Sequence, residues 1–201
     1  MLEIGPGRGA LTDILVRRAG RVVAVELDRA LAALLRERFA LTPSVEIVEA
    51  DILKTDPGEL GGPGYLLVGN VPYYITTPIL FHALACALPR RAVFLVQREV
   101  ATRAMADAGS RSYGALSVNL QVLAHVERVF DIPPGAFKPP PKVDSSVIRV
   151  TPLTDPVLRE GEQGRFRSFV QSLFSQRRKQ IGTILRSLPP SASGVPAVTL
   201  G

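Results

Sequence analysis

The sequence is poor in the residues that most often hold disulfides and metal ions. Its 201 residues include two histidines and a single cysteine, Cys86, which lies in an apolar stretch. One cysteine cannot close an internal disulfide, and so few nitrogen and sulfur ligands do not make a zinc or iron centre. We therefore expect Cys86 to fill the core, and we expect no metal site.

Long apolar runs are also missing. No stretch approaches the roughly 18 residues that a membrane-spanning helix needs, and Met1-Leu2-Glu3 lacks the basic start of a secretory signal peptide. Hydrophobic residues make up 46% of the chain and charged residues 21%, which is typical of an ordinary globular protein. These features predict a cytoplasmic protein without a membrane segment, and we expect it to be a monomer.

Acidic residues are scarce towards the C-terminus. Residues 1–144 carry 16 basic and 15 acidic side chains, whereas residues 145–201 carry 8 and 3. No acid follows Glu162, so the last basic residues stand in a run of one sign: Arg165, Arg167, Arg177, Arg178, Lys179 and Arg186. Such a run indicates a polyanionic partner such as a nucleic acid, although a solvated helix face would have the same composition.

Short β-branched runs alternate with longer segments of helical period along most of the chain. This alternation predicts an α/β fold in which crossover helices cover a parallel sheet. We expect strands over 1–4, 21–26, 45–48, 65–69 and 92–97, and helices over 10–19, 29–39, 78–88 and 99–108. Two further strands, 125–132 and 145–150, are joined by a proline-rich loop, which predicts that the sheet closes with an antiparallel pair.

The texture of the sequence changes after Thr151-Pro152. A polar linker is followed by apolar residues at helical spacing, namely Phe166, Phe169, Val170, Leu173 and Phe174, and then Ile181, Ile184 and Leu185. We therefore expect an α/β domain over residues 1–152 and a small helical domain over residues 153–188. Residues 189–201 are rich in proline, serine, alanine and glycine, and we expect them to form an irregular tail.

A glycine-rich segment, Glu3 to Gly9, lies where the first strand gives way to the first helix. Gly5 and Gly7 allow the backbone to turn tightly and to approach a ligand, and the amino end of the helix presents free amides. Glu26 ends the next strand, where its carboxylate can accept hydrogen bonds from ribose hydroxyls. These residues are compatible with a methyl donor, with a nicotinamide dinucleotide, or with a turn that binds no cofactor.

Asp51 follows the third strand, so we expect its carboxylate at the same edge of the sheet. There it can accept a hydrogen bond from the amino group of a cofactor adenine, between apolar walls formed by Ile52 and Leu27. The alternative is an ordinary helix or turn cap, a role that aspartate often has.

Asn70-Val71-Pro72-Tyr73 comes directly after the fourth strand. The nitrogen of an adenine amine is a poor nucleophile, because its lone pair is delocalised into the ring. The Asn70 amide oxygen and the Val71 carbonyl, held by the rigid Pro72, can accept the two amine hydrogens, and Tyr73 offers a face to an extruded base. This motif indicates methyl transfer to adenine N6 without a general base, although asparagine and proline also form plain turns.

Together these motifs resemble one family. From about Leu2 to Leu188 the chain is similar to the ribosomal RNA adenine N6,N6-dimethyltransferases. The matching segments are Glu3–Gly9, Glu26, Asp51, Asn70–Tyr73, Leu95–Val100, Phe137–Ser145 and Leu173–Lys179. The resemblance implies a Rossmann-like class I methyltransferase sheet, mostly parallel with one antiparallel strand, followed by a small helical domain that contacts RNA.

The same resemblance assigns the residues of the site. The cofactor would be S-adenosyl-L-methionine, bound by Glu3, Gly5, Gly7, Glu26, Leu27, Asp51, Ile52 and Asn70. The catalytic residues would be Asn70, Pro72, Tyr73 and Phe137, with Phe137 either clamping the target base opposite Tyr73 or serving only as a loop anchor. The phosphates of the RNA would be contacted by Arg177, Arg178 and Lys179.

The implied reaction is dimethylation of the N6 amines of two adjacent adenosines near the 3′ end of small-subunit ribosomal RNA, with that RNA or an immature small subunit as partner. Alternatives are a large-subunit adenine methyltransferase of the resistance type and a non-catalytic RNA-binding assembly factor. An NAD-dependent oxidoreductase leaves Asn70–Tyr73 unexplained. The family's segment before the first strand, with its Gln-Asn-Phe-Leu-like motif, has no counterpart, and the helical domain is short. We therefore expect a truncated chain.

Overall fold

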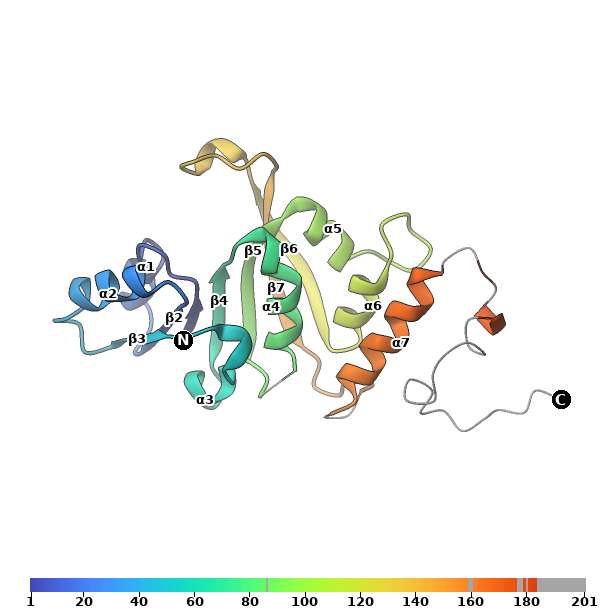
Figure 1. Ribbon diagram of the computed structural model, residues 1–201, viewed down its shortest axis with the longest axis horizontal. Helices are drawn as coiled ribbons and strands as arrows, with labels where there is room; N and C mark the ends of the chain where they lie inside the picture. The colour runs from blue at the N-terminus through green and yellow to red at the C-terminus, as the bar shows by residue number, and fades with distance from the viewer. Residues whose placement is uncertain (86, 159–160, 177–178, 180, 184–201) are drawn as a thin grey trace.

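The computed structural model describes residues 1–85, 87–158, 161–176, 179 and 181–183. Within them, one seven-stranded sheet runs in the order β3-β2-β1-β4-β5-β7-β6 (Figure 1). The strands are β1 (Leu2–Ile4), β2 (Val22–Glu26), β3 (Val45–Glu49), β4 (Leu66–Asn70), β5 (Arg91–Gln97), β6 (Ala124–Ile132) and β7 (Ser145–Pro152). Strands β1 to β5 pair in parallel, and β7 pairs antiparallel with both β5 and β6. The predicted α/β sheet with one antiparallel strand is confirmed.

Helices cover this sheet and bury its central strands. All residues of β1 and β2 are buried, as expected of parallel strands that are covered on both faces. The helices are α1 (Thr12–Val16), α2 (Arg29–Arg38), α3 (Pro57–Gly61), α4 (Thr76–Ala83), α5 (Arg98–Ala104), α6 (Ala115–Gln121) and α7 (Gln163–Ser175). Three short 3-10 turns accompany them: η1 (Ile52–Lys54), η2 (Tyr73–Ile75) and η3 (Pro134–Ala136). The core is centred on β1, β4 and β5, where Leu2, Leu67 and Phe94 are fully buried.

Several helix boundaries differ from those predicted. The helix predicted over 78–88 begins at Thr76, because Pro78 falls in the first turn, where its missing N–H costs no intrahelical bond. The helix predicted over 99–108 ends at Ala104, and a turn closed by Ser110 N donating to Asp107 O follows it. Helix α1 is also shorter than the predicted 10–19. The ends of helices are thus set by local turn chemistry that apolar periodicity does not report.

Two helices were not predicted at all. Helix α3 has only five residues, but its start carries a readable signal, since Asp56 precedes Pro57 and its Oδ1 accepts from Gly58 N at 2.7 Å. Helix α6 begins after Gly114 without a side-chain acceptor from that residue, so no cap residue announces it in the sequence. Its start is held by Gly114 N, which donates to Ser117 Oγ at 3.1 Å, and Leu116 and Leu120 on its buried face pack into the core.

Helix α7 belongs to the segment predicted as a small helical domain, and it packs against α6 (Figure 1). Val170 is buried, and the Phe174 ring meets Tyr113 edge-on with 6.0 Å between centroids. The guanidinium of Arg167 lies 5.4 Å from the centroid of the Phe81 ring. The apolar face of α7 therefore contacts the α/β part of the chain, while the domain boundaries at 152/153 and 188/189 stay predictions.

Some expectations concern residues outside the described part of the chain. These are the packing of Cys86, the continuation of the apolar stripe at Ile184 and Leu185, and the tail over 189–201. Ile181, which is described, is 64% exposed. No helix among the described residues is long and apolar enough to cross a membrane.

Candidate active site

The loop between β1 and α1 is built on glycines with left-handed backbone angles. Gly5, Gly7 and Gly9 have φ values of 66°, 59° and 83°, which other residues adopt only with strain. A Cβ on Gly9 would lie 2.9 Å from a methyl carbon of Leu35 and 3.2 Å from the Phe39 ring, so these side chains would have to shift. A Cβ on Gly5 would stand 3.7 Å from the backbone oxygen of Asn70, which places the loop beside the end of β4.

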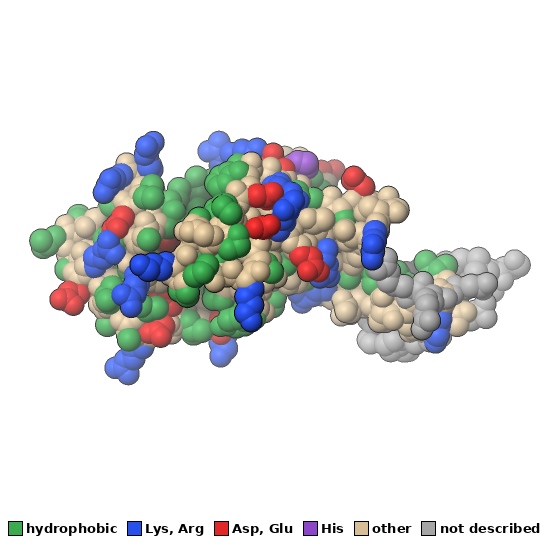
Figure 2. All heavy atoms as spheres, turned by 90° about the horizontal axis from the view of Figure 1, so that it is seen from above, with side chains coloured by type: hydrophobic (Ala, Val, Ile, Leu, Met, Phe, Trp, Pro, Cys, Tyr) green, Lys and Arg blue, Asp and Glu red, His purple; other side chains and the backbone are tan. Residues whose placement is uncertain are grey.

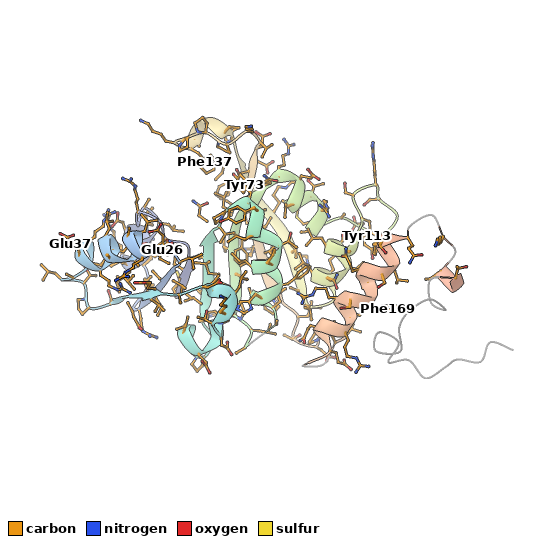
Figure 3. All side chains as sticks on the ribbon, viewed as in Figure 1. Glu26, Glu37, Tyr73, Tyr113, Phe137 and Phe169 are labelled. Carbon is orange, nitrogen blue, oxygen red and sulfur yellow. The ribbon has the colours of Figure 1, made fainter. Side chains whose placement is uncertain are left out.

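Glu26 ties this loop to the end of β2. Its Oε2 accepts from Gly7 N at 3.0 Å and its Oε1 accepts from Asp28 N at 2.9 Å, so the buried carboxylate is held at both oxygens. Each carboxylate oxygen has a further lone pair. Glu26 thus fixes the glycine loop to the end of β2, in the N-terminal part of the sheet where Figure 3 labels it.

Glu3 lies beneath the loop and is almost completely buried. Its Oε2 accepts from the Thr12 hydroxyl at 2.7 Å. Burial raises the pKa of the Glu3 carboxyl, because the charged form is poorly solvated there, and the hydrogen bond from Thr12 offsets part of that effect. The charges of Asp13 and Glu26 raise the pKa further.

We expect the Glu3→Gln variant to be more stable than the wild type at neutral pH. Because the pKa of the Glu3 carboxyl is raised in the folded state, the folded protein holds the carboxyl proton more tightly than the unfolded chain does. The stability of the wild type therefore falls as pH rises through that raised pKa. A glutamine does not ionise, so the variant avoids the cost of a buried charge. A gain of about 1 kcal/mol in the free energy of unfolding would raise the melting temperature by roughly 2–4 °C. Thermal unfolding from pH 4 to pH 8 measures the difference, which should vanish at the acid end. A less stable variant at pH 7 would contradict the argument.

Asp51 occupies the turn after β3 and acts there as a cap. Its Oδ1 accepts from Leu53 N at 3.0 Å, and its Oδ2 lies 4.0 Å from the Lys54 ammonium. The cap that we kept as an alternative is therefore present, and Oδ2 takes no part in it. Ile52 is buried and Leu27 is 66% exposed, so of the two expected apolar walls only Leu27 has a surface open to solvent.

The segment Asn70–Tyr73 turns sharply at the end of β4. Asn70 is exposed, Val71 is buried, and the backbone oxygen of Pro72 accepts from Ile75 N at 3.1 Å. The Tyr73 hydroxyl is hydrogen-bonded to Ser145 Oγ at 2.6 Å, which anchors the ring to the first residue of β7. Ser145 lies in a segment that the sequence analysis singled out, but its contact with Tyr73 was missed.

Phe137 lies on the proline-rich segment 133–144 between β6 and β7, which we call the arm. A pocket of about 360 Å³ joins the arm to the end of β4, and its lining consists of Asn70, Val71, Pro72, Tyr73, Phe137, Pro139, Pro140 and Pro141. Figure 3 shows Phe137 on the arm above Tyr73. The structure thus brings all four residues expected to be catalytic onto one pocket, although their roles stay predictions.

The structure describes one of the three residues expected to bind RNA. Lys179 is exposed, and Arg177 and Arg178 are outside the described residues. Seen from the side of the arm, basic side chains are spread along the molecule and lie beside acidic ones (Figure 2). Surface charge on this face therefore does not by itself mark one RNA-binding patch.

The strand order, the glycine loop after β1 and the acid at the end of β2 define a class I methyltransferase. More specifically, the chain belongs to the ribosomal RNA adenine dimethylase family, whose model matches residues 1–194. Membership confirms the expected enzyme class, an S-adenosyl-L-methionine-dependent ribosomal RNA adenine dimethyltransferase, and with it the expected cofactor.

Individual relatives agree with this assignment. The ribosomal RNA small subunit methyltransferase A of Acidobacterium capsulatum is 49% identical over 194 residues, covering 93% of this chain and 67% of the relative. The protein of the same name from Geobacter sulfurreducens is 46% identical and is covered to 72%, with 98% of this chain aligned. The chain thus spans 67% and 72% of the length of these two relatives.

Two solved structures are similar in fold and sequence. A dimethyladenosine transferase from Plasmodium falciparum superposes with a TM-score of 0.78 at 28% identity, over 92% of this chain and 66% of that one. The 23S rRNA methyltransferase ErmE gives a TM-score of 0.72 at 34% identity, over 94% of this chain and 76% of that one.

Proposed function

We propose that this chain dimethylates the N6 amines of two adjacent adenosines near the 3′ end of small-subunit ribosomal RNA. The observation that carries the proposal is the pocket shared by Asn70–Tyr73 and Phe137, which lies beside the glycine loop at the carboxyl edge of the sheet. Relatives that are 42–49% identical are named as small-subunit enzymes, which favours that RNA as substrate.

The donor side of the site is formed by the glycine loop, Glu26 and Asp51. S-adenosyl-L-methionine supplies an electrophilic methyl group when it is bound. The left-handed turns at Gly5 and Gly7 leave no side chain in the way of a ligand, and Glu26 keeps lone pairs for the ribose hydroxyls. Asp51 keeps Oδ2 for the adenine amino group, since its Oδ1 is used as a cap.

The acceptor side is formed by Asn70–Tyr73 and the arm. The Asn70 side-chain oxygen and the Val71 carbonyl accept the two N6 hydrogens, so the nitrogen lone pair is turned towards the methyl group. Tyr73, fixed by Ser145, and Phe137 hold the extruded base between their rings. This orientation serves in place of a general base, because the amine loses its proton only after the methyl group has been transferred.

Purified ribosomal subunits test the choice of substrate. The chain would be incubated with small or large subunits and methyl-labelled donor, and the RNA nucleosides would be analysed. We expect N6,N6-dimethyladenosine in small-subunit RNA and none in large-subunit RNA. Labelling of large-subunit RNA would instead indicate the specificity that is named for the 23S rRNA methyltransferase ErmE. Binding to small subunits without donor binding would select a non-catalytic assembly factor.

The basic segment Arg177, Arg178 and Lys179 gives a second test of RNA binding. We expect its triple replacement by alanine to weaken binding to all RNA sequences alike and to lower the salt slope by about 2–3 units, since phosphate contacts release counterions. Target choice should survive. RNA affinity at several salt concentrations and the melting temperature should be measured on the same variant. An unchanged fold with an unchanged salt slope would make these residues a solvated face only.

A further inference from the structure

The arm has few internal ways to bend. Five of its twelve residues are prolines, at positions 133, 134, 139, 140 and 141. Proline fixes one backbone angle, so a proline-rich segment behaves as a semi-rigid spacer. It projects from the end of the β6–β7 pair (Figure 1). The position of Phe137 is therefore decided mainly where the arm leaves and rejoins the sheet.

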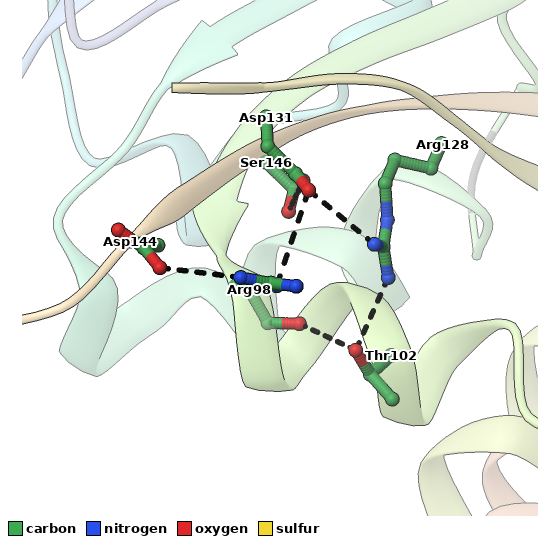
Figure 4. Close-up of polar contacts among 6 residues, drawn as sticks. All are labelled: Arg98, Thr102, Arg128, Asp131, Asp144 and Ser146. Carbon is green, nitrogen blue, oxygen red and sulfur yellow. Dashed lines mark hydrogen bonds and ion pairs between the residues drawn. The ribbon is translucent and has the colours of Figure 1, made fainter. Parts of the chain in front are cut away.

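Arg98 lies between the two roots of the arm, which are the points where the arm leaves β6 and rejoins β7. It is the first residue of α5, directly after β5, and its backbone N donates to the Asp144 carbonyl at 3.0 Å. Its Nη1 donates to Asp144 Oδ2 at 3.3 Å, and its Nε lies 3.9 Å from Asp131 Oδ2 (Figure 4). Asp131 precedes the arm and Asp144 ends it, so one guanidinium contacts both roots.

The carboxylate of Asp131 is itself held in place. Ser146 Oγ donates to Asp131 Oδ1 at 2.5 Å, and this hydrogen bond, with the charges of Arg128 and Arg98, lowers the pKa of Asp131. Arg128 Nη1 donates to the same carboxylate at 3.5 Å, and its Nη2 donates to Thr102 Oγ1 at 3.2 Å. The Thr102 hydroxyl donates to the Arg98 carbonyl at 2.9 Å, which closes the network (Figure 4).

The same root also anchors the other wall of the pocket. Ser145, between Asp144 and Ser146, is fully buried and bonds the Tyr73 hydroxyl. Three consecutive residues thus have one partner each: Asp144 pairs with Arg98, Ser145 with Tyr73, and Ser146 with Asp131. Phe137 and Tyr73 are placed relative to each other through this short stretch of backbone.

We propose that Arg98 is a positioning residue that, by joining Asp131 to Asp144, holds the arm so that Phe137 opposes Tyr73 across the pocket. The inference rests on the proposed function in so far as that pocket receives the target base. Exposed ion pairs add little to stability, and the Arg98 side chain is 56% exposed. The network therefore acts on the geometry of the arm more than on the stability of the fold.

The position of the arm can be measured without RNA or donor. The chain has no tryptophan, so Phe137→Trp introduces a single fluorescent reporter at the pocket. In this background, Arg98→Ala should lower the fluorescence anisotropy and increase quenching by acrylamide. Arg149→Ala is the matched control, since Arg149 Nε pairs with Glu127 Oε1 at 2.7 Å across the same two strands but away from the arm. The control should leave both signals unchanged.

Catalysis gives the second measurement, on the full chain with small-subunit RNA. A misplaced Phe137 should lower the single-turnover rate constant at saturating RNA and donor by about 10- to 100-fold in Arg98→Ala. Donor affinity should stay within about twofold, a difference of less than half a kcal/mol. The reason is that the donor side of the site follows β1, β2 and β3, whereas Arg98 follows β5. Arg98→Lys keeps a cation between the carboxylates and should recover most of the rate.

Asp131→Asn separates positioning from direct RNA binding by Arg98. If Arg98 acts through the arm, Asp131→Asn should reproduce the loss of rate, and the double variant should be no worse than either single one. If Arg98 instead binds a phosphate, removing a neighbouring negative charge should strengthen RNA binding, and the proposal is overturned. Unchanged tryptophan signals in Arg98→Ala would also overturn it. The two proposals can also fail separately. If Arg98→Ala loosens the arm but the unsubstituted chain does not methylate RNA, the inference about Arg98 stands and the proposed function is refuted.

Discussion

Asn70→Ala is expected to lower the single-turnover rate constant of methyl transfer by about 100-fold or more, the range found when a preorganised polar contact to the reacting group is removed. The side-chain oxygen would orient the N6 amine only when a base occupies the pocket, so its loss should appear in the chemical step. Donor affinity should change by less than about tenfold, or 1.4 kcal/mol. Rapid-quench measurement on enzyme saturated with RNA and donor isolates this step.

Tyr74→Ala is the matched control for Asn70→Ala. Tyr74 is 83% exposed and lies one residue beyond Tyr73, outside the lining of the pocket. Its replacement disturbs the same turn without removing a group that faces the base, so the single-turnover rate should remain close to that of the wild type. A collapse of donor affinity in Asn70→Ala, with a normal rate on saturated enzyme, would show that Asn70 serves the donor and not the acceptor.

The central sheet was predictable because β1 and β2 are buried throughout and β5 buries every second residue. Runs such as Val22–Glu26 and Arg91–Gln97 are apolar and β-branched, and parallel strands require connections long enough for a helix. The antiparallel pair was predictable for the opposite reason, since only a proline-rich loop joins its strands. Helix ends were predicted less well, because they depend on single hydrogen bonds at caps and turns.

The parts of the site that lie next to each other in the sequence could also be predicted. Gly5 and Gly7 follow β1, the Asn70–Tyr73 turn begins at the last residue of β4, and the carboxyl ends of parallel strands meet at one edge. Pairings across the sheet could not be predicted. The Tyr73 contact with Ser145 and the Arg98 contacts with Asp131 and Asp144 follow from the register Gln97↔Ser145↔Ile132, which no local pattern specifies.

Glu26 shows why a predicted residue can have a second role that the sequence does not reveal. Its carboxylate was predicted to accept ribose hydroxyls, but in the structure it also accepts from Gly7 N and Asp28 N. Both N–H groups are donors, and a carboxylate with two accepting oxygens satisfies both. Replacement of Glu26 should therefore disturb the glycine loop as well as remove a ligand of the donor.

Glu26→Ala is expected to weaken S-adenosyl-L-methionine binding by about 10- to 100-fold, because charge-assisted hydrogen bonds of about 1.5–3 kcal/mol are lost. Isothermal titration calorimetry measures the affinity, and thermal unfolding checks that the variant folds. Glu46→Ala is the matched control, since it removes a glutamate whose exposed side chain pairs with Arg21 at 2.7 Å at the amino end of the strands. Unchanged donor affinity in Glu26→Ala would remove this residue from the site.

A 2′-deoxyribose analogue of the donor product separates the two roles of Glu26. If the carboxylate bonds the ribose directly, the wild type should bind the product S-adenosylhomocysteine more tightly than the analogue, and Glu26→Ala should bind the two almost equally. If Glu26 only shapes the loop, the variant should weaken both ligands by the same factor and keep the wild type's preference between them. We expect the first result, because both Glu26 oxygens retain lone pairs at the edge where Gly7 turns the loop.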